Sequence, residues 1–446
     1  MIVVKIGGSI QKEKQDYDLI LEKIRKYQEK EDRVIVIVSA IKNATNELIE
    51  ASTNHERSTE IVSNLIDRHF ALLSDLAEGK AFEEGFQQLS KIADDLAKAA
   101  WSVKVLEETT PKIRDYIVSF GERMASILMA SFLKSNGLDA SAVTEPPLVT
   151  DSSYGEANVL LEETKDNVTK ILERVRSKLV VLPGFIGRTT EGKFTTVGRG
   201  GSDYSATVIA KALGVKTVRL ITEVPGIMTG DPRKFRNAKT IPRLSLEEAV
   251  ELSQLGAKRL HPRTFDPLFG TDIKVIVEGL YEEGFTEVMG LCTAQDVLKG
   301  IATVDNLKLV DIESSRMVGR IGSAAAILSE AQKANVNIVA MSQPASETSI
   351  QLVVNSNDAG KLVDRLGELR SLVTDVEVRD VGAVSVVGCG LQRPEVSSKV
   401  IASASGFNPL SISRGMKRVS LTFIAEKEVS DRLAQELHEV VVRWTS

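Results

Sequence analysis

One stretch decides the architecture of this chain: Thr195-Thr196-Val197-Gly198-Arg199-Gly200-Gly201-Ser202-Asp203-Tyr204-Ser205. A short apolar run precedes it, and a helical pattern over 206–213 follows it. Glycines let the backbone turn sharply and come close to a ligand. We expect Ser202 to N-cap the helix, which leaves amide N–H groups and the positive dipole end facing an anion. The stretch therefore predicts a strand, a tight turn and a helix, with an anion site at the turn.

Two charged side chains flank these glycines. Arg199 offers a planar guanidinium that suits a carboxylate. Asp203 places a negative charge where anions would gather, which indicates a cation or a substrate ammonium nearby. A tight turn with a capped helix is the simpler interpretation, because a Gly-rich loop alone is a weak signal. The charges on both sides favour a ligand site.

The composition is that of a globular protein with more than one domain. The chain has 446 residues, of which 43% are hydrophobic and 26% charged, too many for one compact core. A formal net charge of -5 argues against a nucleic-acid partner. No basic leader precedes the first strand, and no apolar run reaches the length of a membrane span. We therefore expect a cytoplasmic protein with no signal peptide and no membrane partner.

The cysteines and histidines give no sign of a metal centre. Cys292 and Cys389 lie far apart in the sequence and form neither a metal nor a redox spacing. The four histidines show no metal-ligand spacing either. We expect two reduced thiols in a cytosolic protein and no protein-built metal site.

The N-terminus begins with a strand that ends in glycines. Residues 1–6 are apolar and rich in β-branched side chains, and Gly7-Gly8-Ser9 follows them. This pattern is typical of a buried parallel strand. Lys5 is unfavourable there unless it is paired. We infer that it reaches phosphate oxygens cradled by the amides of the glycines; the alternative is a lysine that extends from a sheet edge to water.

A second strand places more residues beside the first. An amphipathic helix over 16–30 leads to an apolar strand over 33–38, which closes in Ser39. Strand, helix and strand of these lengths imply a parallel sheet, whose ligands lie beyond the carboxyl ends of the strands. Ser39 therefore belongs to the same edge as Gly7-Gly8-Ser9. Thr45, which we expect to cap the next helix, could face this edge too.

The middle of the first half is helical. Residues 46–108 show helical spacing throughout, which predicts a helical insertion or a lid. The helix over 115–133 contains Gly121, and glycine costs about 1 kcal/mol there relative to alanine, so a packing or ligand reason is expected. Glu122 is a candidate partner for a substrate ammonium, although a lone glutamate is more often a solvated surface residue. Residues 187–193 nearly spell a P-loop, which we reject because Phe194 replaces the Ser or Thr that holds magnesium.

Further candidate residues follow the central stretch. A strand over 217–222 runs into a long loop with two turn signals, which ends near Arg233. A helix over 246–255 precedes Lys258 and Arg259. This pair either opposes the helix dipole or contacts a nucleotide.

From about residue 297 the segments become short and repetitive. Strand, helix, strand, strand, helix and strand occupy 308–380, and the order recurs over 384–442 without a fourth strand. This is a ferredoxin-like βαββαβ repeat. A spare strand over 298–304 precedes the first copy. We expect it to complete the second copy, so that one unit is inserted in the other.

With these motifs in view, the chain resembles the aspartate kinase (aspartokinase) family of the amino-acid kinase superfamily over nearly its whole length. Lys5-Ile6-Gly7-Gly8-Ser9 is similar to the family's opening Lys-Phe-Gly-Gly-Thr/Ser, and Gly198 to Asp203 matches its most specific motif. The stretch 222–233 resembles its nucleotide loop and 256–262 its second ATP segment. The tail resembles paired ACT domains, the usual allosteric amino-acid sensors.

The resemblance implies an α/β fold: a three-layer α/β/α sandwich with a mostly parallel sheet, followed by the ferredoxin-like ACT repeat. The expected catalytic domain is 1–285, with the helical insertion at 46–108. ACT domain 1 is expected at 305–380, and ACT domain 2 at 297–304 plus 381–446. No nucleotide-binding βαβ module follows, so we expect no fused homoserine dehydrogenase. ACT pairs commonly build effector sites across a subunit interface, which implies a homodimer or homotetramer.

The resemblance also implies roles for single residues. Lys5 and Asp203 would be catalytic, with Asp203 organising the phosphate-binding groups and Mg²⁺. Glu122 would hold the substrate ammonium and Arg199 a carboxylate. The residues that would bind aspartate are Ser39, Thr45, Glu122, Arg199, Gly200, Gly201 and Ser202. The residues that would bind ATP are Lys5, Gly7, Gly8, Ser9, Thr222, Glu223, Met228, Arg233, Lys258 and Arg259.

Some positions depart from the family, and others point to an effector. Glu223 replaces a usual Asp and Met228 a usual Tyr, which concerns base recognition rather than activity. Asn337, Ile338 and Gln343 look like effector-binding positions of the first ACT unit, for threonine or lysine. The second unit has lost the comparable signature at 413–417, so we expect it to brace or dimerise and not to sense.

The implied reaction converts ATP and L-aspartate to ADP and 4-phospho-L-aspartate, the first step toward threonine, methionine and lysine, under feedback control. An ionised carboxylate needs positioning, charge neutralisation and magnesium rather than a strong base. One rival is another kinase, for glutamate or a nucleoside monophosphate; the ACT repeat and the motif around Arg199 argue against it. The other is a catalytically silent ACT-type amino-acid-binding regulator; Lys5 and Asp203 argue against it, since a pure sensor needs no phosphate site.

Overall fold

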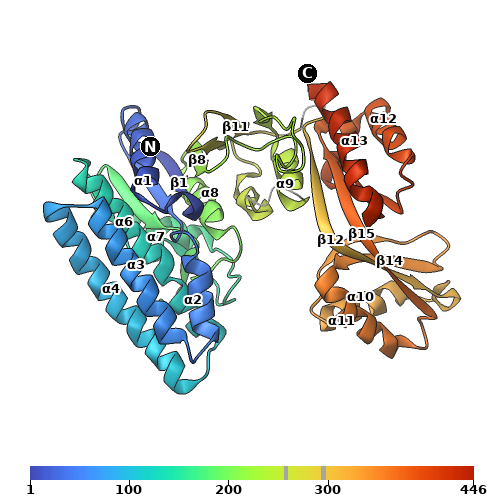
Figure 1. Cartoon of the computed structure of the whole chain (residues 1–446), viewed down its shortest axis with the longest axis horizontal. Coiled ribbons are helices and arrows are strands. Elements are labelled where there is room, and N and C mark those ends of the chain that lie inside the picture. The colour runs from blue at the N-terminus through green and yellow to red at the C-terminus, as the bar shows by residue number, and fades with distance from the viewer. Residues whose placement is uncertain (256–259, 293–297, 446) are drawn as a thin grey trace. The chain divides into compact units, whose positions relative to one another are not determined.

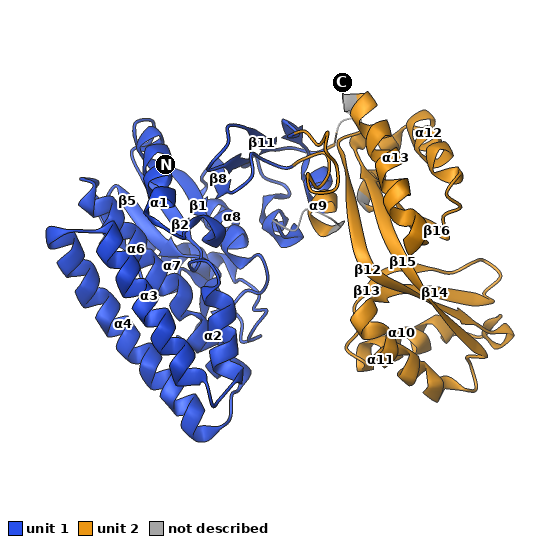
Figure 2. Ribbon diagram, viewed as in Figure 1, with its two compact units in different colours: residues 1–227, 240–250, 259–291 blue, residues 228–239, 251–258, 292–446 orange. Residues whose placement is uncertain are grey.

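The structure, a computed structural model, describes residues 1–255, 260–292 and 298–445 (Figure 1). The chain divides into two units, each with its own hydrophobic core (Figure 2). Unit 1 holds 1–227, 240–250 and 259–291, and unit 2 holds 228–239, 251–258 and 292–446. Two short segments, which lie in sequence between parts of unit 1, therefore belong to the second unit.

Unit 1 is built on an eight-stranded sheet in the order β3-β5-β2-β1-β8-β10-β11-β9. Every neighbouring pair is parallel except β10 and β11, as the βαβ pattern predicts. The strands are β1 (Ile2–Ile6), β2 (Val34–Val38), β3 (Ala140–Ala142), β5 (Leu179–Pro183), β8 (Thr217–Thr222), β9 (Arg243–Leu244), β10 (Lys274–Gly279) and β11 (Phe285–Val288).

Helices cover both faces of this sheet, which gives the predicted three layers. On one face Ile2, Val4 and Ile6 of β1 join a core with α1 (Lys14–Gln28) and α6 (Phe120–Ser135). The other face packs against α8 (Gly201–Leu213), which lies beside α7 (Leu161–Arg174). Since side chains alternate along a strand, Lys5 points toward the face that α8 covers.

The predicted helical insertion is confirmed. It consists of α2 (Ala44–Thr53), α3 (Ser58–Leu76) and α4 (Gly79–Leu106). The single helix predicted over 115–133 is two helices, α5 (Pro111–Val118) and α6. Pro111 occupies the first turn of α5, where its missing N–H and fixed φ are tolerated, so the proline begins a helix there.

Smaller elements complete unit 1. The predicted hairpin is present as β6 (Ile186–Thr189) and β7 (Phe194–Thr196), and β4 (Leu148–Thr150) pairs with β6. The near P-loop sequence forms this hairpin, so its rejection is confirmed. The stretch Pro111–Ser135, which α5 and α6 occupy, is long and apolar enough to cross a membrane by length and composition alone, contrary to the expectation that no apolar run reaches this length. Within it, 89% of an 18-residue window is buried inside the protein, as in helices of a protein core.

Unit 2 carries a six-stranded antiparallel sheet in the order β13-β14-β12-β15-β17-β16. Its strands are β12 (Gly300–Glu313), β13 (Ile338–Ser342), β14 (Ser349–Asn355), β15 (Asp375–Val387), β16 (Ser411–Arg414) and β17 (Ser420–Glu426). Its helices are α9 (Leu246–Leu255), of which unit 2 holds only the end, α10 (Ser323–Lys333), α11 (Ser356–Leu366), α12 (Pro394–Ser405) and α13 (Lys427–Thr445).

Two long strands join the two copies of the repeat. The spare strand and the first strand of copy one are one strand, β12, with a register shift between Val304 and Leu307. Residues 300–304 of β12 pair with 383–387 of β15, which belong to the second copy, whereas 307–313 pair with 375–381. The spare strand thus joins the second copy, as its position before the first copy suggested.

The short segment 228–239 packs onto α13 within unit 2. Thr229 Oγ1 lies 3.1 Å from Nε2 of His438, and the Phe235 ring stacks on that imidazole with centroids 4.4 Å apart. Lys234 pairs with Asp305 of β12 at 2.7 Å. Phe235 is buried in the core of unit 2.

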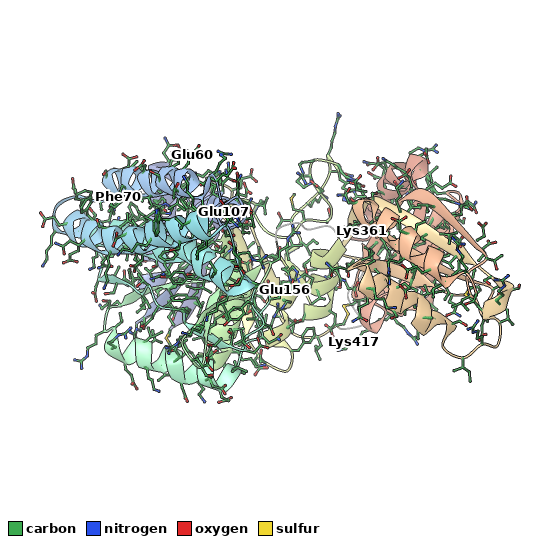
Figure 3. The ribbon with its side chains drawn as sticks, turned by 90° about the horizontal axis from the view of Figure 1, so that it is seen from below. Glu60, Phe70, Glu107, Glu156, Lys361 and Lys417 are labelled. Carbon is green, nitrogen blue, oxygen red and sulfur yellow. A yellow bond between two sulfur atoms is a disulfide. The ribbon has the colours of Figure 1, made fainter. Side chains whose placement is uncertain are left out.

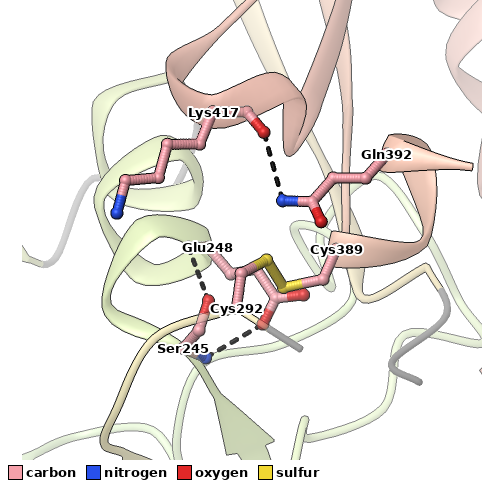
Figure 4. The surroundings of a disulfide bond; sticks show 6 residues. All are labelled: Ser245, Glu248, Cys292, Cys389, Gln392 and Lys417. Carbon is pink, nitrogen blue, oxygen red and sulfur yellow. Dashed lines mark hydrogen bonds between the residues drawn. A yellow bond between two sulfur atoms is a disulfide. The ribbon is translucent and has the colours of Figure 1, made fainter. Parts of the chain in front are cut away.

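The expectation of two reduced thiols is wrong. Cys292 and Cys389 form a disulfide within unit 2 (Figure 4). Their separation of 97 residues hides the proximity. Pairing of Gly300 with Val387 across β12 and β15 brings the segments that carry the two cysteines to the same end of the sheet.

Candidate functional site

A cavity of about 860 Å³ opens in unit 1 beyond the carboxyl ends of β1 and β2. This is the edge at which parallel α/β sheets bind ligands. The cavity brings together predicted residues from five separate segments: Lys5, Gly8, Ser9, Ser39, Thr45, Glu122, Arg199, Gly200, Gly201, Ser202 and Asp203. Gly7 lies behind them, where a Cβ atom would stand 3.6 Å from the Lys5 ammonium.

Lys5 is paired inside the cavity. Its Nζ lies 2.7 Å from Oδ1 of Asp203, and the two side chains are only 11% and 8% exposed. The pairing follows from the fold, because β1 directs Lys5 toward α8 and Asp203 lies in the first turn of α8. An ammonium held there by one carboxylate keeps other N–H donors for a phosphate oxygen.

The helix cap differs from the prediction. The N-cap of α8 is Gly200, with φ of 72°, and Ser202 lies inside the first turn. A Cβ atom at Gly200 would come within 2.2 Å of the Cβ of His261, so this position needs glycine for both its φ and its packing. Asn43 similarly precedes α2, and Thr45 lies inside that helix. The first-turn amides of α8 have no partner within the helix, so they remain available to an anion.

Glu122 is the buried carboxylate of the cavity. It is 2% exposed; its Oε1 accepts the Ala40 N–H at 3.1 Å, and its Oε2 has no hydrogen-bond partner. Burial raises the pKa of Glu122 to about 8, against the opposing effects of the Ala40 amide and the Lys5 charge. An ammonium donor would satisfy the open oxygen and favour the ionised form. Gly121 is explained by packing, because a Cβ there would lie 2.8 Å from the Ala40 side chain.

Several residues that line the cavity were not predicted from the sequence as site residues. They come from α2, α5 and three loops: Lys42, Asn43, Asn46, Arg114, Asp115, Gly155, Glu156 and Phe185. Asp115 is the most buried charged residue among them. Its position in the sequence did not mark it as a site residue. Acidic residues are common near the start of a helix, because they interact favourably with the helix dipole.

The predicted nucleotide residues fall in different parts of the chain. Thr222 ends β8 in unit 1, and Glu223 follows it. Met228 and Arg233 belong to the segment 228–239 of unit 2. The exposed Arg233 side chain pairs with Asp231 at 2.6 Å. Lys258 and Arg259 lie outside the described residues.

The predicted effector positions surround one edge strand of unit 2. Asn337 is exposed just before β13, Ile338 opens this strand, and Gln343 is exposed just after it. Six residues of extended chain span about 20 Å. Asn337 and Gln343 are therefore at opposite ends of β13 in one chain.

Family models match most of the chain. The model of the amino acid kinase family matches residues 1–279. A model of the ACT domain matches residues 310–368, which include β13 and the helices on both sides of it.

Full-length relatives are similar over nearly all of the sequence. Aspartokinase 2, chloroplastic, of Arabidopsis thaliana is 29% identical over 98% of this chain and 83% of its own length. The chain spans about half, 47%, of the bifunctional aspartokinase/homoserine dehydrogenase 1 of the same plant, to which it is 25% identical over 91% of its residues.

The fold agrees with solved structures of a bacterial relative. Escherichia coli aspartokinase III in complex with lysine and aspartate matches with a TM-score of 0.82 at 26% identity, over 99% of both chains. The same protein in complex with aspartate and ADP matches with a TM-score of 0.81 at 26% identity, over 98% of this chain and 99% of that one.

Proposed function

This chain belongs to the amino acid kinase family, and we propose that it is an aspartate kinase whose reaction takes place in the cavity of unit 1. It transfers the γ-phosphoryl group of ATP to the side-chain carboxylate of L-aspartate and forms ADP and 4-phospho-L-aspartate. This is the first step of the aspartate-family pathway to threonine, methionine and lysine. The similarity to aspartokinases that hold aspartate and ADP supports this function over the silent-regulator alternative.

One observation carries the proposal: a single cavity holds a separate charge for each charged part of the substrates. Lys5 faces a phosphate, Arg199 a carboxylate, and the open oxygen of Glu122 an ammonium. An amino acid with a second carboxylate fits this set, because one carboxylate can be held while the other is presented to the phosphate.

The chemistry requires alignment and charge neutralisation. The attacking carboxylate is already ionised, so no residue has to remove its proton. Lys5 and the first-turn amides of α8 draw negative charge from the transferring phosphoryl group. Asp203 holds Lys5 in place at 2.7 Å, while Gly7, Gly8 and Ser9 let the phosphates approach β1.

Magnesium fits the donors of this site. Asp203 supplies carboxylate oxygens at the cavity wall, and oxygen is the ligand type that Mg²⁺ prefers. We assign Asp203 to hold the ion together with the phosphates. When bound, Mg²⁺ neutralises charge on the phosphoryl oxygens.

Regulation belongs to unit 2. The ACT unit takes a feedback amino acid, lysine or threonine, at Asn337, Ile338 and Gln343. The positions at opposite ends of β13 suit a site completed by a second chain, which supports assembly through the ACT units into a homodimer or homotetramer. We propose a cytoplasmic location because ATP is a substrate; the disulfide removes the argument from reduced thiols.

The test is a hydroxamate assay of acyl-phosphate formation with aspartate and glutamate in parallel, with and without lysine or threonine. We expect aspartate-selective turnover that falls at least about 100-fold in Lys5→Ala. Lys193→Ala, at an exposed turn lysine away from the cavity, is the matched control and should retain activity. Saturable amino-acid binding without turnover by the wild type would instead support the silent regulator.

A further inference from the structure

Asp115 is a buried carboxylate at the cavity that the proposed reaction does not use. It lies on α5, is 1% exposed, and lines the cavity. Its Oδ2 accepts the N–H of Gly155 at 2.8 Å and the N–H of Thr196 at 2.9 Å. Its Oδ1 accepts the hydroxyl of Thr196 at 3.0 Å. Three donors from two distant segments therefore converge on one side chain.

Both segments lead to the central glycine-rich stretch. Thr196 ends β7 and stands two residues before Gly198. Gly155 and Glu156 pack against Gly198 from the other side: a Cβ there would lie 3.5 Å from the Gly155 carbonyl oxygen and 3.4 Å from Cγ of Glu156. Figure 3 labels Glu156 on this loop. Asp115 therefore links Thr196 to the loop that contains Gly155, and these two segments lie next to the backbone that precedes Arg199.

Arg199 depends on that backbone for its direction. Its side chain is exposed at the cavity, and the described part of the chain gives its guanidinium no hydrogen bond or ion pair. A flexible side chain without such partners can reach only the region around its own Cα and Cβ, and the backbone sets where these two atoms lie. The conformation of residues 196–198 therefore decides where the guanidinium meets a ligand.

We propose that Asp115 is a positioning residue for substrate recognition: through Thr196 and Gly155 it fixes the loop that presents Arg199 to a substrate carboxylate. The inference rests on the proposed role of Arg199 in the aspartate kinase reaction. Asp115 itself uses its oxygens on the protein and does not bind the substrate.

The three bonds suit a carboxylate. An ionised carboxylate only accepts hydrogen bonds, so it can serve two backbone N–H groups and a hydroxyl together. An asparagine could keep its oxygen on the two N–H groups and donate its NH₂ to the Thr196 oxygen, so breaking all three bonds requires loss of the carboxyl group, as in Asp115→Ala. Burial raises the pKa of Asp115 above its usual range, and the three donors together with nearby Arg114 oppose that effect.

Two substitutions remove the hydrogen bonds between Asp115 and its partners to different extents. Asp115→Ala removes all three acceptors and should raise the KM for aspartate at least about tenfold, because small misplacements of a binding group are strongly felt. Thr196→Val removes only the hydroxyl bond and should raise it about threefold. The KM for ATP should stay within twofold in both. Calorimetric titration of aspartate without ATP should show the same losses of affinity.

Thr164→Val is the matched control for stability. Thr164 is a fully buried threonine of unit 1, away from the cavity, whose hydroxyl accepts the N–H of Val149 at 2.9 Å and donates to the Val149 carbonyl at 3.2 Å. Its loss should lower stability at least as much as Thr196→Val and leave both KM values unchanged. If Asp115→Ala does not fold, Thr196→Val measured against Thr164→Val decides the question.

The deciding measurement repeats the substitutions in an Arg199→Ala background. If Asp115 acts through Arg199, Thr196→Val and Asp115→Ala should have almost no further effect on aspartate KM there. Effects that persist in full, or equal increases of the KM for ATP, would overturn the inference. Failure of the proposed function would look different, because wild type and Thr164→Val would both lack aspartate turnover.

Discussion

At the scale of the residue, Glu122 keeps one buried oxygen without a hydrogen-bond partner. Buried polar atoms in proteins almost always have a hydrogen-bond partner, yet Oε2 of Glu122 has none while Oε1 holds the Ala40 amide. The side chain lines the cavity and is only 2% exposed. The side chain is therefore prepared for a cationic group from outside.

This environment predicts a pH dependence of substrate binding. The pKa of Glu122 is raised to about 8 by burial, so the free protein holds this group protonated below that pH. Aspartate binding to the ionised form should then release a proton, and KM for aspartate should fall as pH rises toward 8. Glu122→Gln should raise that KM at least about tenfold and remove the trend. KM profiles between pH 6 and 9 measure this; an unchanged trend in the variant would refute the assignment.

Residues of the motifs were predictable, and residues that support them were not. Lys5, Glu122 and Asp203 carry a charge that a buried or glycine-rich context makes unusual, so their types alone point to chemistry. Asp115 lacked such a context, because its partners Gly155 and Thr196 are 40 and 81 positions away. The N-cap of α8 was also predicted wrongly because a distant residue decides it: Gly200 packs against His261.

At the scale of the element, helix α3 contains a histidine held neutral by its surroundings. His69 is fully buried; its Nδ1–H donates to the Leu65 carbonyl at 2.7 Å, and its Nε2 has no partner. Protonation would place an uncompensated charge in the helical insertion. Burial accordingly lowers the pKa of His69 to about 4.

The insertion should therefore lose stability in mild acid. The folded pKa lies below that of the unfolded chain, so the stabilisation is present above pH 6.5 and is lost as pH falls toward 4, by roughly 3 kcal/mol. His69→Met should lose less stability than wild type between pH 7.5 and 4.5. Urea unfolding at both values measures it, with His55→Met as a control on the same insertion. Equal losses in wild type and His69→Met would contradict the prediction.

Element types were predictable where periodicity is strong, and junctions were not. The helices of the insertion and the strands of the parallel sheet follow from spacing alone. The fusion of two predicted strands into β12 does not, because the predicted strands stop at 304 and resume at 308, and only pairing with both halves of β15 carries one strand through the gap.

At the scale of the whole molecule, the disulfide closes a long loop. Cys292 and Cys389 enclose the whole first copy of the repeat, with a separation of 97 residues. Closing a loop of this size in the unfolded chain stabilises the folded state by roughly 2–4 kcal/mol. A reductant should therefore lower the denaturation midpoint of the wild type. The Cys292→Ser/Cys389→Ser double variant should start lower and not respond to reductant; a response there would show that the effect lies elsewhere.

The segment 228–239 has a consequence for exchanging regulatory tails between kinases of this kind. It precedes the tail in sequence by more than 50 residues, yet Thr229, Lys234 and Phe235 are seated on α13 and β12. A chimera joined at one point near residue 292 would set one parent's Phe235 against the other parent's counterpart of His438. A chimera that exchanges unit 2 therefore needs three segments from the same parent, 228–239, 251–258 and 292–446. A single crossover would separate side chains of unit 2 that pack against each other.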